Sequence, residues 1–131
     1  MKSTRSFGQK MHKYFFDTYA IIEIIKGNPN YNQFTEELFA TTTINLSEVY
    51  YYLLNEVGEY YAHETIQKLK MEYFDITPAL ALKAVAFRHA HKKDKLSYVD
   101  CLGYVIAIHN NLLFLTGDNG FEKIPHVAFV K

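Results

Sequence analysis

The sequence contains one cysteine, no net charge and no long hydrophobic run. The single cysteine, Cys101, excludes an internal disulfide framework and any zinc site built from cysteines. It lies in an apolar stretch, so we expect an inert, packed thiol. No apolar stretch reaches the roughly 18 residues that a transmembrane helix needs. The residues before Tyr14 contain no apolar segment like that of a signal peptide. We therefore expect a cytoplasmic protein without a membrane partner.

The charge balance excludes a global basic field that would indicate nucleic-acid binding. The chain has 14 acidic and 14 basic residues, although local patches can still bind anions. Its six histidines include no pair at the HExxH spacing of a helical zinc site. We interpret them as surface or core residues.

The length and composition are typical of a single folded domain. A chain of 131 residues can bury roughly two thirds of its unfolded surface. Because 49% of the residues are hydrophobic, a disordered chain is excluded. Residues 1–10 are polar, basic and aperiodic, and we expect them to be a disordered extension. No repeat, low-complexity segment or linker divides the remainder, so residues 11–131 are expected to form one domain.

Short apolar segments alternate with segments of helical periodicity along the chain. Strands are expected at residues 12–16, 40–44, 71–76, 112–116 and 127–130. Helices are expected at residues 18–27, 31–39, 45–58, 59–70, 77–91 and 97–109. Alternating strands and helices with short connections predict a parallel sheet covered by helices, and therefore an α/β fold.

Four acidic residues stand where an apolar strand ends or a helix begins: Asp17, Glu48, Asp100 and Asp118. In an α/β sheet these positions gather on one edge, where ligands bind. Four carboxylates there would repel one another unless a cation or a raised pKa neutralised them. Hard divalent cations such as Mg²⁺ take oxygen ligands of this kind. The pattern therefore indicates a metal-dependent phosphoryl-transfer site.

Each of these acids also has a purely structural explanation. Asp17 suits the N-cap of the helix that follows it. Glu48 and Asp100 suit the last position of capping boxes, and Asp118 precedes an Asn-Gly turn. The two explanations are compatible, because a helix N-terminus keeps a carboxylate ionised and a hard metal needs an ionised oxygen.

Four segments resemble the signature segments of PIN domains in their order and approximate spacing. These segments are Phe16-Asp17-Thr18, Asn45-Leu46-Ser47-Glu48-Val49, Ser97-Tyr98-Val99-Asp100-Cys101 and Leu115-Thr116-Gly117-Asp118-Asn119-Gly120-Phe121. The resemblance runs from about Met11 to the C-terminus, and the short length is similar to that of VapC-type toxins of toxin–antitoxin pairs. It implies a three-layer α/β/α sandwich with a short, mostly parallel central sheet of four to five strands.

The resemblance implies a Mg²⁺- or Mn²⁺-dependent endoribonuclease in which the four acids form the catalytic and metal-binding site. Thr116, two residues before the last acid, would orient the carboxylate of Asp118 or a bound water. Phe121 matches an aromatic residue that packs beneath the site. Gly120 stands where relatives often carry a further polar or acidic side chain, so the resemblance does not support a fifth ligand.

Basic residues concentrate between positions 83 and 95, directly before Ser97 and Asp100. We expect four of them to hold the RNA backbone beside the acidic site: Arg88, Lys92, Lys93 and Lys95. The alternative is a solvated helix end, where cations are favoured by the helix dipole.

The 11 tyrosines are numerous on the helical stretch after Glu48, and tyrosine suits protein interfaces because it combines area with a polar tip. A homodimer surface and a groove for a small antitoxin protein both fit, as does a role in the core alone. Two alternatives to a toxin remain: a catalytically silent PIN-like binding or scaffold module, and a PIN nuclease of RNA processing without an antitoxin. A phospho-acceptor signalling domain would need an acid pair after the first strand, where Asp17 stands alone.

Overall fold

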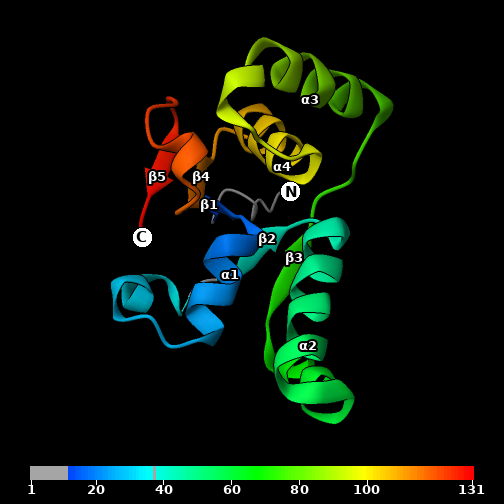
Figure 1. Ribbon diagram of the computed structural model, residues 1–131, viewed down its shortest axis with the longest axis vertical. Helices are drawn as coiled ribbons and strands as arrows, with labels where there is room; N and C mark the ends of the chain where they lie inside the picture. Colours follow the sequence, from blue (N-terminus) through cyan, green and yellow to red (C-terminus); the bar gives the residue numbers. More distant parts are fainter. Residues whose placement is uncertain (1–11, 37) are drawn as a thin grey trace, which may run out of the picture.

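The computed structural model describes residues 12–36 and 38–131 as an α/β fold (Figure 1). The strands are β1 (Tyr14–Phe16), β2 (Phe39–Thr41), β3 (Met71–Tyr73), β4 (Leu113–Thr116) and β5 (Val127–Phe129). The α-helices are α1 (Thr18–Ile25), α2 (Thr43–Lys68), α3 (Pro78–Ala90) and α4 (Tyr98–His109). Three 3₁₀ segments complete the described part of the chain: η2 (Pro29–Phe34), η3 (Lys92–Asp94) and η4 (Asn119–Phe121). The extension expected at residues 1–10 lies outside the described residues. Within the described part, no helix has both the length and the apolarity to cross a membrane.

Every strand pairing in the described chain is parallel, as predicted. Strand β4 lies between β1 and β5, and β2 pairs with β3 as a separate two-stranded ladder. The two ladders meet where the hydroxyl of Thr41 in β2 donates to the carbonyl oxygen of Phe16 in β1, at 2.8 Å. This contact brings the ends of β1 and β2 together, and the segments that follow both strands therefore start at neighbouring points.

The strands lie between two pairs of helices, with α3 and α4 on one side and α1 and α2 on the other (Figure 1). Adjacent strand residues point to opposite faces, so Phe15 packs in the cluster below α3 and α4 whereas Phe16 packs against α1 and α2. Both rings are fully buried. This alternation produces the three-layer arrangement expected from the resemblance to PIN domains.

Helix α4 lies close to the sheet because Gly103 has no side chain. A Cβ atom at this position would stand 2.8 Å from Phe15 and 2.9 Å from Phe114. The close approach fixes the height of α4 above the strands, and with it the position of Asp100 in the first turn of the helix.

Helix α2 begins before the residue expected from the sequence. Its N-cap is Thr42, whose side chain accepts the N–H of Asn45, and strand β2 therefore ends at Thr41. The capping box expected to end at Glu48 is wrong, because Glu48 lies beyond the first turn. The expected break at Gly58 is confirmed by its φ of 83°, a conformation that glycine adopts without a steric penalty.

The helix expected at residues 31–39 is replaced by the 3₁₀ segment η2. In a 3₁₀ helix the side chains at i and i+3 share one face, and here Tyr31 and Phe34 are the buried pair. The hydroxyl of Tyr31 donates to the carbonyl oxygen of Val130 at 2.6 Å. Because only Tyr31 and Phe34 of this segment are buried and they lie three residues apart, a short 3₁₀ segment is enough to place both side chains in the core. Strand β2 then begins at Phe39.

Candidate functional site

The four acids predicted from the sequence line one pocket of about 480 Å³. Asp17 follows β1 and Asp118 follows β4, so both lie at the carboxyl ends of neighbouring parallel strands. Asp100 comes from the first turn of α4, and Glu48 comes from α2. The convergence follows from the parallel pairing, because parallel strands bring their carboxyl ends to one edge of the sheet.

Asp17 is the most deeply buried of the four, with 2% of its surface exposed. Its Oδ2 accepts the hydroxyl proton of Thr116 at 2.7 Å, while its buried Oδ1 has no hydrogen-bond partner among the described residues. Burial and, to a smaller extent, the neighbouring carboxylates of Asp100 and Glu48 raise the pKa of Asp17 from 3.8 to about 8. Without a cation nearby, this carboxyl group is therefore protonated at neutral pH.

Asp100 forms the capping box predicted for the start of α4. Its backbone N–H donates to Oγ of Ser97 at 3.0 Å, and its Oδ2 accepts the N–H of Ser97 at 3.0 Å. Burial raises the pKa of Asp100, while the hydrogen bonds from Ser97 oppose that rise. The carboxylates of Asp118 and Glu48 also favour its protonated form. Asp100 is thus oriented by the helix start and remains coupled to the other acids.

Asp118 adopts the turn that the Asp-Asn-Gly sequence predicts, because its Oδ1 accepts the N–H of Gly120 at 3.0 Å. A Cβ atom on Gly120 would lie 2.5 Å from Leu96 Cδ2 and 3.0 Å from the carbonyl oxygen of Asp94. Glycine is therefore required sterically at position 120 in this chain, because a larger side chain would force residues 94–96 to move.

Thr116 contacts a different acid from the one that the sequence comparison indicated. Its hydroxyl donates to Asp17 and accepts the N–H of Asp118 at 3.1 Å. Thr116 therefore orients the carboxylate of Asp17 instead of that of Asp118, and the alternative expectation, that it orients a bound water, stays a prediction. Phe121 is fully buried, and its ring centroid lies 4.8 Å from that of Phe114. It packs in the cluster of α3 and α4.

Glu48 is positioned by a chain of hydrogen bonds through Thr18, Asn45 and Thr42, which were not among the predicted site residues. Thr18 donates its hydroxyl proton to Glu48 Oε1 at 2.6 Å, and Asn45 Nδ2 donates to Thr18 Oγ1 at 2.9 Å. Thr42 in turn donates to Asn45 Oδ1 at 2.6 Å. Only 1% of the surface of Asn45 is exposed. The available signal was the placement of Thr18 directly after Asp17 and of Asn45 three residues before Glu48.

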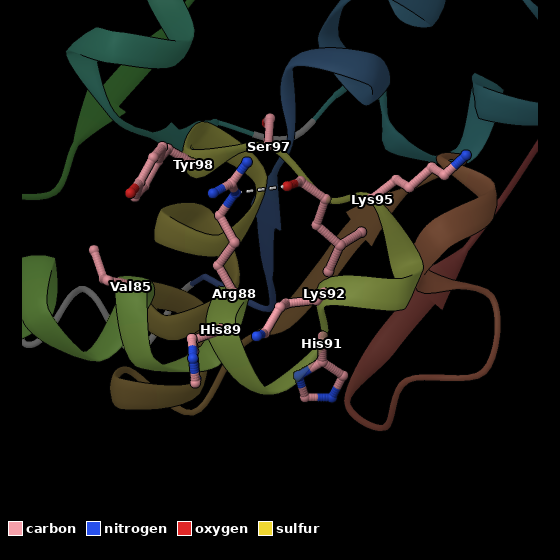
Figure 2. Close-up of a pocket in the computed structure, with 9 residues that line it drawn as sticks. Val85, Arg88, His89, His91, Lys92, Lys95, Ser97 and Tyr98 are labelled. Carbon is pink, nitrogen blue, oxygen red and sulfur yellow. Dashed lines mark hydrogen bonds between the residues drawn. The ribbon is translucent and has the colours of Figure 1, made fainter.

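The cationic residues expected to contact RNA divide into two groups. Arg88, Lys92 and Lys95 line a second cavity, of about 570 Å³ (Figure 2). Lys93 is exposed but does not line it. Arg88 donates from Nε to the carbonyl oxygen of Leu96 at 2.9 Å, and its guanidinium carbon lies 4.5 Å from the centre of the Tyr98 ring.

The acid pocket suits a hard divalent cation by the chemistry of its donors. Its charged groups are all carboxylates, and the unpartnered Oδ1 of Asp17 is a buried acceptor that a cation would satisfy. In the part of the chain that the structure describes, no three His, Cys, Asp or Glu side chains close on a common point where they could hold an ion together.

The family model of the PIN domain matches residues 14–127 of this chain. The chain belongs to the PIN domain family. No curated protein matched it significantly.

Several solved structures are similar to this PIN-domain protein. A toxin–antitoxin complex from Klebsiella pneumoniae contains a chain with 23% identity and a TM-score of 0.70, covering 88% of this chain and 95% of that one. VapC20 of Mycobacterium tuberculosis, a sarcin–ricin loop cleaving toxin, has 15% identity and a TM-score of 0.71, covering 91% and 100%. A DNA-bound VapBC complex from Salmonella typhimurium contains a chain with 20% identity and a TM-score of 0.69, covering 89% of this chain and 96% of that one. At these identities the likeness establishes the shared fold.

Proposed function

We propose that this PIN-domain protein is a metal-dependent endoribonuclease that serves as the toxin of a type II toxin–antitoxin pair. The convergence of the four acids on one pocket carries the proposal, together with the buried, unpartnered Oδ1 of Asp17. Folding has removed this oxygen from water without supplying a hydrogen bond, which is costly unless a ligand compensates for it. A site that binds a cation explains both observations.

Asp17, Glu48, Asp100 and Asp118 would hold Mg²⁺ or Mn²⁺. When bound, such an ion would activate a water molecule and offset the charge that develops on a phosphodiester during hydrolysis. The surrounding residues prepare the oxygens for that role.

Each of three acids is held by a hydrogen bond from a neighbouring hydroxyl or backbone group. Thr116 holds Asp17, Thr18 holds Glu48, and the backbone N–H of Ser97 holds Asp100. These bonds fix the carboxylates before a substrate arrives, which lowers the reorganisation needed during catalysis.

The proposed substrate and partner are supported by the surroundings of the acid pocket and by the structural neighbours. The cavity lined by Arg88, Lys92 and Lys95 could hold the phosphate backbone. The Mycobacterium tuberculosis neighbour cleaves the sarcin–ricin loop, and two others are a toxin–antitoxin complex and a VapBC complex. Tyr60 and Tyr61 are 69% and 64% exposed, and they offer area for an antitoxin or a second copy of the chain.

Cleavage of total RNA tests the proposal. The purified protein should degrade RNA in Mg²⁺ or Mn²⁺ and stop in EDTA, and Asp100→Asn should lose at least about 99% of the rate because it removes a charge from the metal site. Asp75→Asn is the matched control, since Asp75 is exposed and does not line the pocket. Equal cleavage by wild type and Asp100→Asn, or unchanged cleavage in EDTA, would contradict the proposal. Co-purification from the native host tests for the antitoxin.

A further inference from the structure

The cavity of about 570 Å³ lies at the junction of α3, η3 and α4, and it differs from the acid pocket in charge. Arg88, His89 and Lys92 line it, and no acidic side chain is among the described residues that do. Arg88 donates to the carbonyl oxygen of Leu96, and its guanidinium lies beside the ring of Tyr98 (Figure 2). The amine of Lys95 extends away from Arg88 in this view. The cavity therefore offers an anion site beside an aromatic ring.

Tyr98 has the geometry of a stacking platform. The Arg88 guanidinium covers one face of its ring at 4.5 Å, while 55% of the residue remains exposed. The bond from Arg88 Nε to Leu96 keeps the guanidinium in place against the ring, and more than half of the Tyr98 surface stays accessible to solvent. A nucleobase can stack on an open aromatic face regardless of its sequence.

The platform adjoins the acid pocket through helix α4. Tyr98 is the first residue of α4, and Asp100 lies in the same first turn. Ser97, which lines the cationic cavity, also holds Asp100, which lines the acid pocket. Both cavities therefore reach the start of α4, and a nucleotide bound at Tyr98 would lie near the acid pocket.

We propose that the cavity beside Tyr98 is a nucleotide subsite for unpaired RNA, with the base stacked on Tyr98 and its phosphate bound by Arg88 and Lys92. The inference rests on the proposed nuclease function and assigns Tyr98 the role of positioning one base of the substrate. Bases within a duplex remain stacked on one another, so they do not present a face to Tyr98.

Binding of labelled RNA in EDTA tests the subsite apart from catalysis. The probes are an unstructured fluorescent RNA oligomer and the same strand paired with its complement, measured by fluorescence anisotropy. Tyr98→Ala should weaken binding of the single strand about tenfold because a stacking contact is lost. Tyr98→Phe should stay within about twofold of wild type, and duplex binding should not respond to either change. Circular dichroism checks that both variants fold.

Lysines 92 and 93 provide a matched pair, because only Lys92 lines the cavity. Lys92→Ala should lower the slope of log affinity against log salt by about 0.7 to 1, the value for one phosphate contact. Lys93→Ala should lower it by less than half as much. Adenosine 5′-monophosphate at micromolar concentration should not displace the oligomer, since one subsite supplies only part of the affinity.

Wild-type affinity in Tyr98→Ala, or equal weakening by Tyr98→Phe, would overturn the stacking platform. An equal loss of slope in the two lysine variants would indicate a diffuse cationic surface instead of a subsite. Displacement by micromolar nucleotide would indicate a site for free nucleotide. If RNA is not cleaved but the Tyr98 dependence holds, the nuclease function fails and the subsite stands.

Discussion

Replacing Asp17 by Asn should stabilise the metal-free protein while abolishing its proposed activity. The pKa of Asp17 rises from 3.8 to about 8 on folding, mainly because the group is buried. Between these pH values the folded protein holds a proton that the unfolded chain has released. Asp17 therefore contributes stability that is fully present below pH 3.8 and is lost as the pH rises through about 8. Asparagine has no such proton to lose.

The size of the effect follows from the shift of about four pH units, at about 1.4 kcal/mol per unit. Water and ions in the open pocket screen part of this free energy, so we expect Asp17→Asn to raise the free energy of unfolding by about 2 to 3 kcal/mol at pH 7.5. Between pH 5 and 7.5 the free energy of unfolding should also fall less steeply with pH in the variant than in wild type. The difference between the two slopes should be about 1 kcal/mol per pH unit.

Urea unfolding in EDTA at several pH values, followed by circular dichroism, measures both quantities. Asp75→Asn serves as the control, because Asp75 is exposed. In Mg²⁺ wild type should become more stable than Asp17→Asn. A cation that binds the folded state stabilises it, and the variant lacks one of the charged ligands that would bind the cation. A variant no more stable than wild type in EDTA, with a parallel pH dependence, would refute the assignment of Asp17 as a buried carboxyl group that is protonated in the metal-free protein.

Two further substitutions test the supports of the site. Thr18→Val keeps the shape of the side chain but removes the hydrogen bond to Glu48, and we expect RNA cleavage to fall about tenfold with a change of about 1 kcal/mol in unfolding free energy. Unaltered cleavage would show that the Thr18 contact does not position Glu48. Gly103→Ala would place a Cβ within 3 Å of two phenylalanine rings, and thermal or urea unfolding should show a loss of about 1 to 3 kcal/mol. If Gly103→Ala has the same free energy of unfolding as wild type, then α4 can move away from the sheet without a loss of stability.

Local sequence patterns determined most of the element order and several of the helix starts. Ser97 and Asp100 form their capping box, and Thr77 caps α3 with Pro78 in the first turn. Such bonds join residues two to four positions apart, so the chain carries them whatever surrounds it. The start of α2 differs from the expected Asn45 because both Thr42 and Asn45 suit the N-cap position, and in the structure Thr42 takes it.

The sequence by itself determined that Asp17 and Asp118 would follow strands and that Asp100 would begin a helix, and the parallel order of the strands brings these acids to one edge. Only the tertiary structure decided which neighbour holds each acid. Thr116 reaches Asp17 across 99 positions, and Thr18 reaches Glu48 across 30. The burial that leaves Asp17 protonated also arises from packing between elements. Desolvation and long-range hydrogen bonds depend on which elements meet, which no local spacing encodes.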